Sequence, residues 1–283
     1  RAYSLNYMKL YEIFQKNSSH CLLKITKPGS RAPRTPGFAR GHALNGYGFV
    51  APAIIESRGG LIDALYLARE GLRMSEELTF EITDGVALLT LNRPEAHNTM
   101  TQGIIDGLGA AYRRCDEDDD IRVVVLTGAG RSFCAGADMS GGASTFDGSA
   151  QMVEVNSLPL STQAWEVRKP VIAACNGHAV GAGLGLAMQV DMRVFANEGK
   201  YGFLQSRRGV VADFAIEYLL PRLVGFERAF ELLVRAHRLS GEEAVAWGLA
   251  GRSVPAEQVL DTALELAREM ALQCAPLAMA LHK

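Results

Sequence analysis

The sequence of 283 residues lacks any apolar run of about 18 residues, the length that a membrane-spanning helix needs. It also lacks an excess of charge of either sign, because 29 Lys and Arg stand against 31 Asp and Glu. Nucleic-acid-binding domains usually carry a clear basic excess. We therefore expect neither a membrane protein nor a nucleic-acid partner, and the apolar content of 48% fits a globular chain with a core.

Cysteine is scarce, and the sequence contains none of the common metal motifs. The 5 cysteines form no C-x-x-C pair, and neither H-E-x-x-H nor a Cys/His cluster occurs. Zinc and redox sites depend on such closely spaced ligands. We expect free thiols in a reducing, cytoplasmic setting and no bound metal. The acidic run 116–120 lacks the spacing of a calcium loop, so a solvated connection is favoured there over a metal site.

The first part of the chain differs in composition from the rest. Residues 1–73 carry 11 Lys and Arg against 4 Asp and Glu, whereas residues 74–283 carry 18 against 27. The segment has no long apolar core with a cleavage site, which argues against a signal peptide. A transit peptide and a small extra domain are alternatives. We interpret residues 1–73 as an extension that is disordered or is translated upstream sequence, and residues 74–283 as the folded domain.

Several short signals predict regular structure after Met74. Asp84-Gly85 lies between two strand-like runs and is typical of a type I′ hairpin turn. Residues 101–115 carry apolar side chains at helical spacing. We expect residues 214–236 to form a helix that Pro221 breaks. The sequence Ser-Gly-Glu-Glu at 240–243 predicts a capping box for the next helix.

Residues 169–209 contain the most informative pattern. An apolar run, Val171–Cys175, precedes Asn176-Gly177 and then glycines at 181, 183 and 185 before an apolar helical run. A glycine loop that enters a helix leaves backbone N–H groups unpaired, and these suit a phosphate or a developing oxyanion. The stretch lacks G-x-G-x-x-G and the Lys-Ser/Thr of a P-loop, so a nucleotide is disfavoured. The alternative is that the glycines only permit close packing of helix and strand.

A second stretch of this kind, and a strand upstream, complete a pattern. The three sequences LNRPEAHNTM (91–100), VVVLTGAGRSFCAGADM (123–139) and KPVIAACNGHAVGAGLGLAM (169–188) together resemble the crotonase (enoyl-CoA hydratase/isomerase) superfamily. The resemblance covers residues 74–283. It implies an α/β fold, a crotonase/ClpP-type spiral of repeated ββα units with a C-terminal helical region. It also implies an acyl-CoA thioester substrate, so that coenzyme A enters as part of the substrate and no separate cofactor is expected.

The resemblance assigns several residues to the site. It places two backbone N–H groups that hold the thioester oxygen at Ala137 and Ala182. It places substrate-binding positions at five residues, which are Ala135, Asp138, Gly181, Gly183 and His97. Residues 139–165 fall where the family shapes the acyl pocket. His178 lies inside the glycine loop, where a structural histidine is favoured over a base.

Departures from the family pattern point to one type of chemistry. The two glutamates of hydratases in this family fall on Gly185 and Gln205 here, and neither can act as an acid or base. Asp213 resembles the single catalytic acid of enoyl-CoA and ring-epoxide acyl-CoA isomerases in the superfamily. The competing interpretation is that Asp213 only caps a helix starting at Phe214. We also expect Phe203, Leu204, Val211 and Phe214 to make the surroundings of Asp213 apolar.

The resulting expectation is an enoyl-CoA isomerase that stabilises an enolate and moves a proton with one base. The alternatives are an enoyl-CoA hydratase-type lyase, an aryl-CoA dehalogenase-like activity, and a non-catalytic acyl-CoA-binding member. The resemblance further implies a homotrimer or hexamer. Because members of the family usually continue with more helix, the chain is also expected to be clipped at its C-terminal end.

Overall fold

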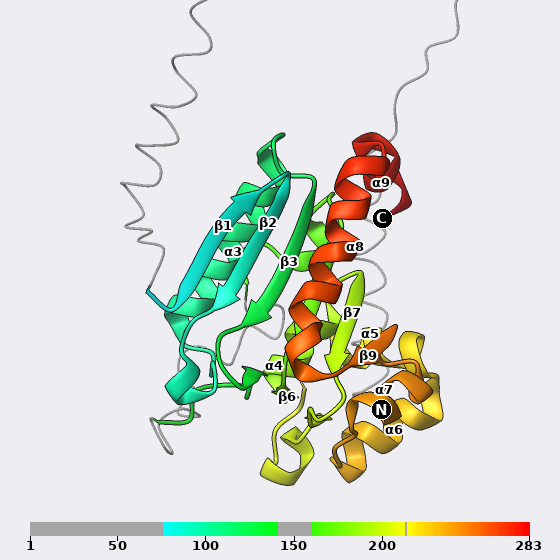
Figure 1. Ribbon diagram of the computed structural model, residues 1–283. Helices are drawn as coiled ribbons and strands as arrows, with labels where there is room; N and C mark the ends of the chain where they lie inside the picture. Colours follow the sequence, from blue (N-terminus) through cyan, green and yellow to red (C-terminus); the bar gives the residue numbers. More distant parts are fainter. Residues whose placement is uncertain (1–75, 141–159, 213) are drawn as a thin grey trace, which may run out of the picture. The chain divides into compact units, whose positions relative to one another are not determined.

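A computed structural model describes residues 76–140, 160–212 and 214–283 (Figure 1). The expected extension over residues 1–73 lies outside the described residues, as do Asp213 and segment 141–159 of the expected acyl-pocket region. The chain divides into two units, residues 1–53 and 54–283, and every described residue belongs to the second unit.

The domain opens with the predicted hairpin. Strand β1 (Leu78–Thr83) pairs antiparallel with β2 (Val86–Leu91), and Thr83 lies opposite Val86. The two turn residues, Asp84 and Gly85, have φ angles of 51° and 77°. Positive φ at both central residues defines a type I′ turn, so the hairpin and its turn are confirmed.

The hairpin leads into a sheet whose other strands run parallel. The strand order is β1-β2-β3-β5-β7-β9, and every pair from β2 to β9 is parallel. The later strands are β3 (Val123–Gly128), β5 (Val171–Cys175), β7 (Met192–Ala196) and β9 (Arg252–Val254). All residues of β3 and β5 are buried, as expected for parallel strands with helices on both faces.

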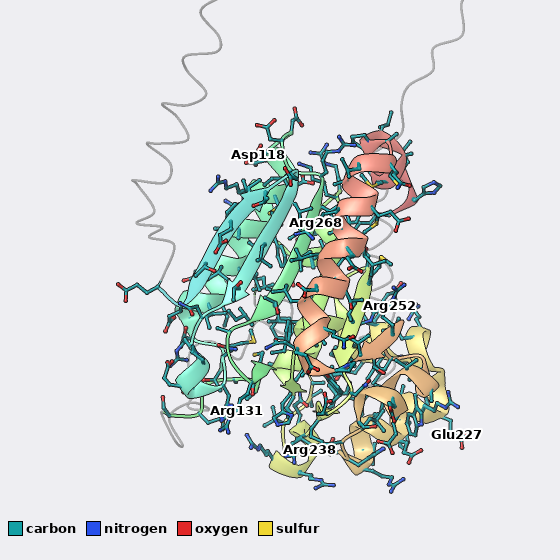
Figure 2. All side chains as sticks on the ribbon, viewed as in Figure 1. Asp118, Arg131, Glu227, Arg238, Arg252 and Arg268 are labelled. Atoms are coloured by element: carbon teal, nitrogen blue, oxygen red, sulfur yellow. The ribbon has the colours of Figure 1, made fainter. Side chains whose placement is uncertain are left out.

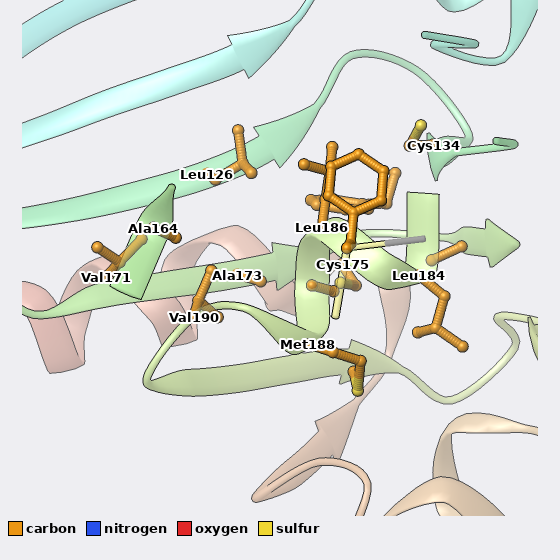
Figure 3. Close-up of a cluster of buried hydrophobic side chains, with 14 of the residues drawn as sticks. Leu126, Cys134, Ala164, Val171, Ala173, Cys175, Leu184, Leu186, Met188 and Val190 are labelled. Atoms are coloured by element: carbon orange, nitrogen blue, oxygen red, sulfur yellow. The ribbon is translucent and has the colours of Figure 1, made fainter. Parts of the chain in front are cut away.

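Helices cover the two faces of this sheet. Helix α8 (Val259–Gln273) lies in front of the sheet in Figure 1 and α3 (Gln102–Glu117) lies behind it. The contact side of α8 is built from small residues, Ala263, Ala267 and Ala271, which pack against valines of the sheet. On the other face, α3 and α4 (Ala182–Met188) share one core with the opposite sides of the strands. Figure 3 shows the α4 part of this core, where Leu184, Leu186 and Met188 lie near β5.

A second, smaller sheet is formed by short strands. Strands β4 (Ser132–Cys134), β6 (His178–Val180) and β8 (Tyr201–Gly202) pair in parallel, in that order. Each follows a strand of the large sheet after a short turn, so β3-β4, β5-β6 and β7-β8 are repeats of one unit. The crotonase-type spiral of repeated units is therefore confirmed.

The C-terminal helices correct one prediction. Pro221 lies inside α5 (Ile216–Val224) and does not break it, because the break falls at Gly225, before α6 (Phe226–Arg235). Gly225 has a φ angle of 81°, a conformation that ends a helix and that glycine adopts without strain. The break between α5 and α6 therefore lies at Gly225, where φ is positive, four positions after Pro221.

The remaining helices agree with their sequence signals. Ser240 and Glu243 form the predicted capping box of α7 (Gly241–Trp247), with Oγ of Ser240 accepting from the Glu243 N–H at 3.2 Å. Such a cap contributes about 0.5–2 kcal/mol. Helix α9 (Pro276–His282) follows α8, and short 3₁₀ helices lie at Pro94–Ala96, Ala164–Glu166, Gln205–Arg208 and Ala256–Gln258. None of the helices in the described ranges is long and apolar enough to cross a membrane.

Candidate active site

Two loops meet at the same edge of the small sheet. One loop follows β4 and contains Ala135 to Asp138, and the other follows β6 and contains Gly181 and Ala182. Because β4 and β6 are parallel neighbours, their carboxyl ends lie together. A methyl group added at Gly136 would stand 2.9 Å from the Val180 carbonyl oxygen and 3.8 Å from the Ala182 nitrogen. The two positions expected to supply N–H groups are therefore on adjoining segments of backbone.

Glycine is required where these segments touch. A Cβ at Gly183 would lie 2.2 Å from the Cys134 carbonyl oxygen, far inside van der Waals contact. Gly181 has φ 57° and ψ −125°, a conformation that disfavours a side chain. The packing role of the glycines is thus real at Gly183. It does not exclude a binding role, because close packing is what brings the two loops together.

The backbone N–H groups of Ala137 and Ala182 are unpaired in the described part of the chain. Ala137 forms a parallel bridge with Met100, in which Met100 N–H donates to Gly136 at 2.8 Å and Asp138 N–H donates to Met100 at 3.1 Å. In such a bridge the N–H of Ala137 itself points away from Met100. Ala182 is the first residue of α4, where no helical acceptor is available. Neither N–H has a backbone acceptor among the described residues, so both are available to a ligand oxygen.

His97 lies beside the first loop. Its backbone carbonyl accepts from the Ala135 N–H at 3.0 Å, and its ring contacts Ser132 Oγ at 2.9 Å through Nδ1 and Arg131 at 3.1 Å through Nε2. Since the Arg131 guanidinium can only donate, the neutral ring carries its proton on Nδ1. The structure therefore brings His97 and Ala135 together and uses both ring nitrogens of His97 within the protein.

Asn98 holds this loop from the inside, and sequence reasoning missed it. Its side chain is fully buried, accepts from the Arg93 N–H at 2.8 Å, and donates to the Ala129 and Ser132 carbonyls at 2.9 and 2.8 Å. Its φ angle is 54°, in the left-handed region that asparagine tolerates better than most residues. The available signal was an asparagine following a Pro-containing turn, which is weak by itself.

Asp138 is engaged in a structural network. It accepts from the Ser140 N–H at 2.9 Å and pairs with Arg93 at 2.9 Å, and Arg93 also lies 3.1 Å from Glu77. The hydrogen bonds from Ser140, followed by Arg93, lower the pKa of Asp138 to about 2. At neutral pH the Asp138 carboxylate is ionised and pairs with Arg93. It therefore links loop 93–99 to loop 135–140.

His178 lies at the opposite end of β6 from Ala182. Its Nδ1 accepts from the Lys200 N–H at 3.1 Å, and burial, followed by electrostatic interactions with neighbours that include His97, Lys200 and Arg131, lowers the pKa of His178. It faces a cavity of about 310 Å³ at the carboxyl ends of the large sheet's strands, and Arg131 in Figure 2 is part of its wall. His178 is therefore not brought together with the two unpaired N–H groups.

The start of α5 flanks the second loop. A Cβ at Gly185 would lie 3.1 Å from the Phe214 ring, so this ring fills the space above Gly185. Helix α5 begins at Ile216 with Ala215 as N-cap, and Phe214 and Ala215 precede it with φ angles of 58° and 56°, outside the helical region. The predicted helix start at Phe214 is therefore wrong, and Asp213, the residue considered as its cap, lies outside the described residues.

Of the apolar residues predicted to surround Asp213, some are buried and one is exposed. Phe203 and Phe214 are buried and Leu204 is half-buried, as expected. Val211 is 77% exposed, so the prediction that it contributes to an apolar pocket is wrong. Val211 follows the left-handed Gly209, in a stretch between Gln205–Arg208 and α5 that has no regular pairing. Alternation of apolar residues in such a stretch carries no information on which side faces the core.

Comparisons with known proteins identify relatives of this chain. The sequence model of the family described as enoyl-CoA hydratase/isomerase matches residues 81–283. The chain is 38% identical over 204 residues to a 1,2-epoxyphenylacetyl-CoA isomerase of Escherichia coli K12, covering 71% of this chain and 78% of the relative. It is 38% identical over 202 residues to the probable enoyl-CoA hydratase EchA12 of Mycobacterium tuberculosis H37Rv, covering 66% and 68%.

Solved structures show the same likeness. A probable enoyl-CoA hydratase/isomerase from Mycobacterium abscessus superimposes with a TM-score of 0.69 at 46% identity, covering 73% of this chain and 79% of that one. An enoyl-CoA hydratase from Mycobacterium avium gives a TM-score of 0.64 at 29% identity, covering 73% and 85%. These values extend the likeness from the motifs to the arrangement of both sheets.

Proposed function

The chain belongs to the enoyl-CoA hydratase/isomerase family, and from this membership we propose that it is an enoyl-CoA isomerase acting on acyl-CoA thioesters. The observation that carries the proposal is the pair of unpaired backbone N–H groups at Ala137 and Ala182 on adjoining loops. Ala135, Gly181, Gly183, His97 and Asp138 then line or hold the thioester site around them.

The two N–H groups would bind the thioester oxygen. Removing a proton from the carbon next to a thioester places negative charge on that oxygen, and fixed donors stabilise this charge without having to reorganise. The packing of Gly183 against Cys134 supports this role, because it fixes the second loop against the first.

Asp213 would serve as the single base. It takes the C2 proton, the electrons of the broken C–H bond move to the thioester oxygen, and the C3–C4 double bond shifts to C2–C3 as C4 receives the proton. The base ends unchanged, so one carboxylate is enough. Its neighbour Phe214 packs over Gly185 of α4, one turn beyond Ala182, which supports a position near the thioester.

Hydration is the second candidate, because several relatives are named probable enoyl-CoA hydratases. Adding water profits from two groups, one to activate water and one to protonate carbon. Gly185 and Gln205 supply neither, and a side chain at Gly185 would be crowded by Phe214, whose atoms lie 3.1–3.3 Å from the position of a Cβ there. This arrangement favours isomerisation.

Turnover measurements separate the candidates. We expect conversion of a 3-enoyl-CoA to the conjugated 2-enoyl-CoA at roughly 1–10³ per second, a typical range for enzymes. Hydration of crotonyl-CoA should be at least about 10²-fold slower, the usual contribution of one acid or base. Hydration at a typical enzymatic rate would contradict the isomerase proposal, and binding without either reaction would identify a non-catalytic member.

We also propose a homotrimer or hexamer, and its support is an apolar stripe on α6. Phe226, Phe230 and Val234 follow one another at helical spacing and are 75%, 57% and 55% exposed. Contiguous exposed apolar surface of this kind marks interaction sites. Leu272, Leu277 and Leu281 add exposed apolar side chains on α8 and α9.

Light scattering tests the assembly. The wild-type chain is expected to have the mass of a trimer or hexamer, and the double change Phe226→Glu with Phe230→Glu should yield smaller species, because it places two carboxylates in the stripe. Thr83→Glu, at an exposed position on β1, is the matched control and should leave the mass unchanged. A wild-type monomer would contradict the proposal.

A further inference from the structure

Segment 97–100 holds loop 135–138 through three main-chain hydrogen bonds of 2.8 to 3.1 Å. The bonded groups on the loop are the Ala135 N–H, the Gly136 carbonyl and the Asp138 N–H. The Ala137 N–H, the first group proposed to hold the thioester oxygen, takes no part in these bonds. Its direction is therefore set by the position of segment 97–100 rather than by a partner of its own.

The side chain of Asn98 fixes segment 97–100 in its turn. Its Oδ1 accepts from the Arg93 N–H at 2.8 Å, and its Nδ2 donates to the carbonyls of Ala129 at 2.9 Å and Ser132 at 2.8 Å. Ala129 follows β3 and Ser132 begins β4. The carboxamide thus ties segment 97–100 to the turn between these strands, and both N–H groups of Nδ2 are used.

The surroundings of Asn98 suit a carboxamide of this length. Its φ angle is 54°, a conformation that asparagine adopts more readily than most residues. A Cβ built on Gly128 would stand 2.8 Å from Nδ2 of Asn98, so the glycine at 128 leaves the space that the carboxamide fills. Aspartate has nearly the same shape, but its ionised side chain has no N–H to donate to the two carbonyls.

We infer that Asn98 is a positioning residue that directs the Ala137 N–H toward the thioester oxygen. The inference rests on the proposed function, because it requires Ala137 and Ala182 to hold that oxygen. A hydrogen bond weakens steeply as its angle closes, so a misdirected donor stabilises the developing negative charge less well. Asn98 is fully buried and acts through the main chain of loop 135–138, without touching the substrate.

Infrared spectroscopy of a bound ester tests the inference. The probe is butyryl-CoA labelled with ¹³C at the thioester carbonyl, a saturated ester that has no double bond to move. Hydrogen bonds to the carbonyl oxygen weaken the C=O bond, so the wild-type protein should lower the stretching frequency of the bound ester. Asn98→Gly accepts the positive φ but has no carboxamide, and it should produce a smaller shift. Only bound ester is shifted, so unfolded protein does not imitate this result.

Kinetics and a second variant complete the test. The kcat for a 3-enoyl-CoA should fall by up to about 10²-fold in Asn98→Gly, the effect of a small misplacement at a catalytic centre, while the Kd of butyryl-CoA changes little. Asn98→Asp keeps the shape of the side chain and should show the same two losses, which covers the case that the glycine variant does not fold. The control is Ser240→Ala, which removes the cap of α7 and should leave the carbonyl shift and kcat unchanged.

The outcomes separate the inference from the proposed function. A carbonyl shift of full size in either folded Asn98 variant would overturn the inference and leave the proposed function intact. A bound ester whose carbonyl is not shifted by the wild-type protein would contradict the two donors and overturn both proposals. A wild-type protein that shifts the carbonyl but isomerises no 3-enoyl-CoA would overturn the isomerase proposal alone, and a reduced shift in the Asn98 variants would still support the inference.

Discussion

Replacing Asp213 with asparagine is expected to lower the conversion of 3-enoyl-CoA to 2-enoyl-CoA by about 10²–10⁴-fold, the usual contribution of a general base. Asparagine keeps the size of the side chain but cannot accept the C2 proton. Binding of a saturated acyl-CoA should change little, because the thioester oxygen is held by backbone groups. The measurement is single-turnover kinetics on the conjugated product, paired with calorimetric binding.

The control for this change is Asp261→Asn, on the exposed surface of α8, which should leave turnover unchanged. Asp213→Glu keeps a carboxylate on a longer side chain and should retain more activity than Asp213→Asn. Near-native turnover by Asp213→Asn would show that the base lies elsewhere. Asparagine is as good a helix cap as aspartate, so a loss of activity in Asp213→Asn cannot be assigned to a missing cap.

Replacing Ala182 with proline is expected to lower kcat by about 10²–10³-fold, which is typical of removing one oxyanion donor. Proline lacks the N–H group that Ala182 would offer to the thioester oxygen. Ala182 occupies the first position of α4, and proline is well tolerated there because its fixed φ suits a helix start. The change therefore removes the donor with little expected effect on the helix.

Ala182→Gly is the matched control for the proline variant. It retains the backbone N–H and should keep most of the activity, since only a methyl group is lost. Circular dichroism of both variants checks that the helix content is unchanged. A proline variant with full activity would place the second donor at another residue.

Local signals predicted much of the fold, and the failures have a common cause. The hairpin turn at Asp84-Gly85 and the capping box at Ser240 depend on residues adjacent in sequence, and both were confirmed. The break between α5 and α6 was misplaced, because proline is unfavourable in helices in general but is tolerated in a nine-residue helix that ends at Gly225. The left-handed pair Phe214-Ala215 has no sequence signal, since neither residue favours positive φ.

The parts of the site that lie within sequence motifs could be predicted. Contacts between residues far apart in the sequence could not. The approach of the two loops could be expected from their glycines, and Gly183 packs against Cys134 with no space for a methyl group. The bridge from Met100 that turns the Ala137 N–H outward joins segments 37 positions apart, and spacing alone does not reveal it. The same holds for the contacts of the buried Asn98 side chain.

The location of the two proposed oxyanion donors in the main chain has a consequence for mutational drift. A codon change at Ala137 or Ala182 alters a side chain, but only a change to proline deletes the donor itself. The proposed base, in contrast, depends entirely on its codon. During evolution, the acidic and basic residues and the residues lining the pocket can therefore be replaced while the two backbone donors remain. Each intermediate protein would still bind the thioester, so new reactions can arise without loss of substrate binding.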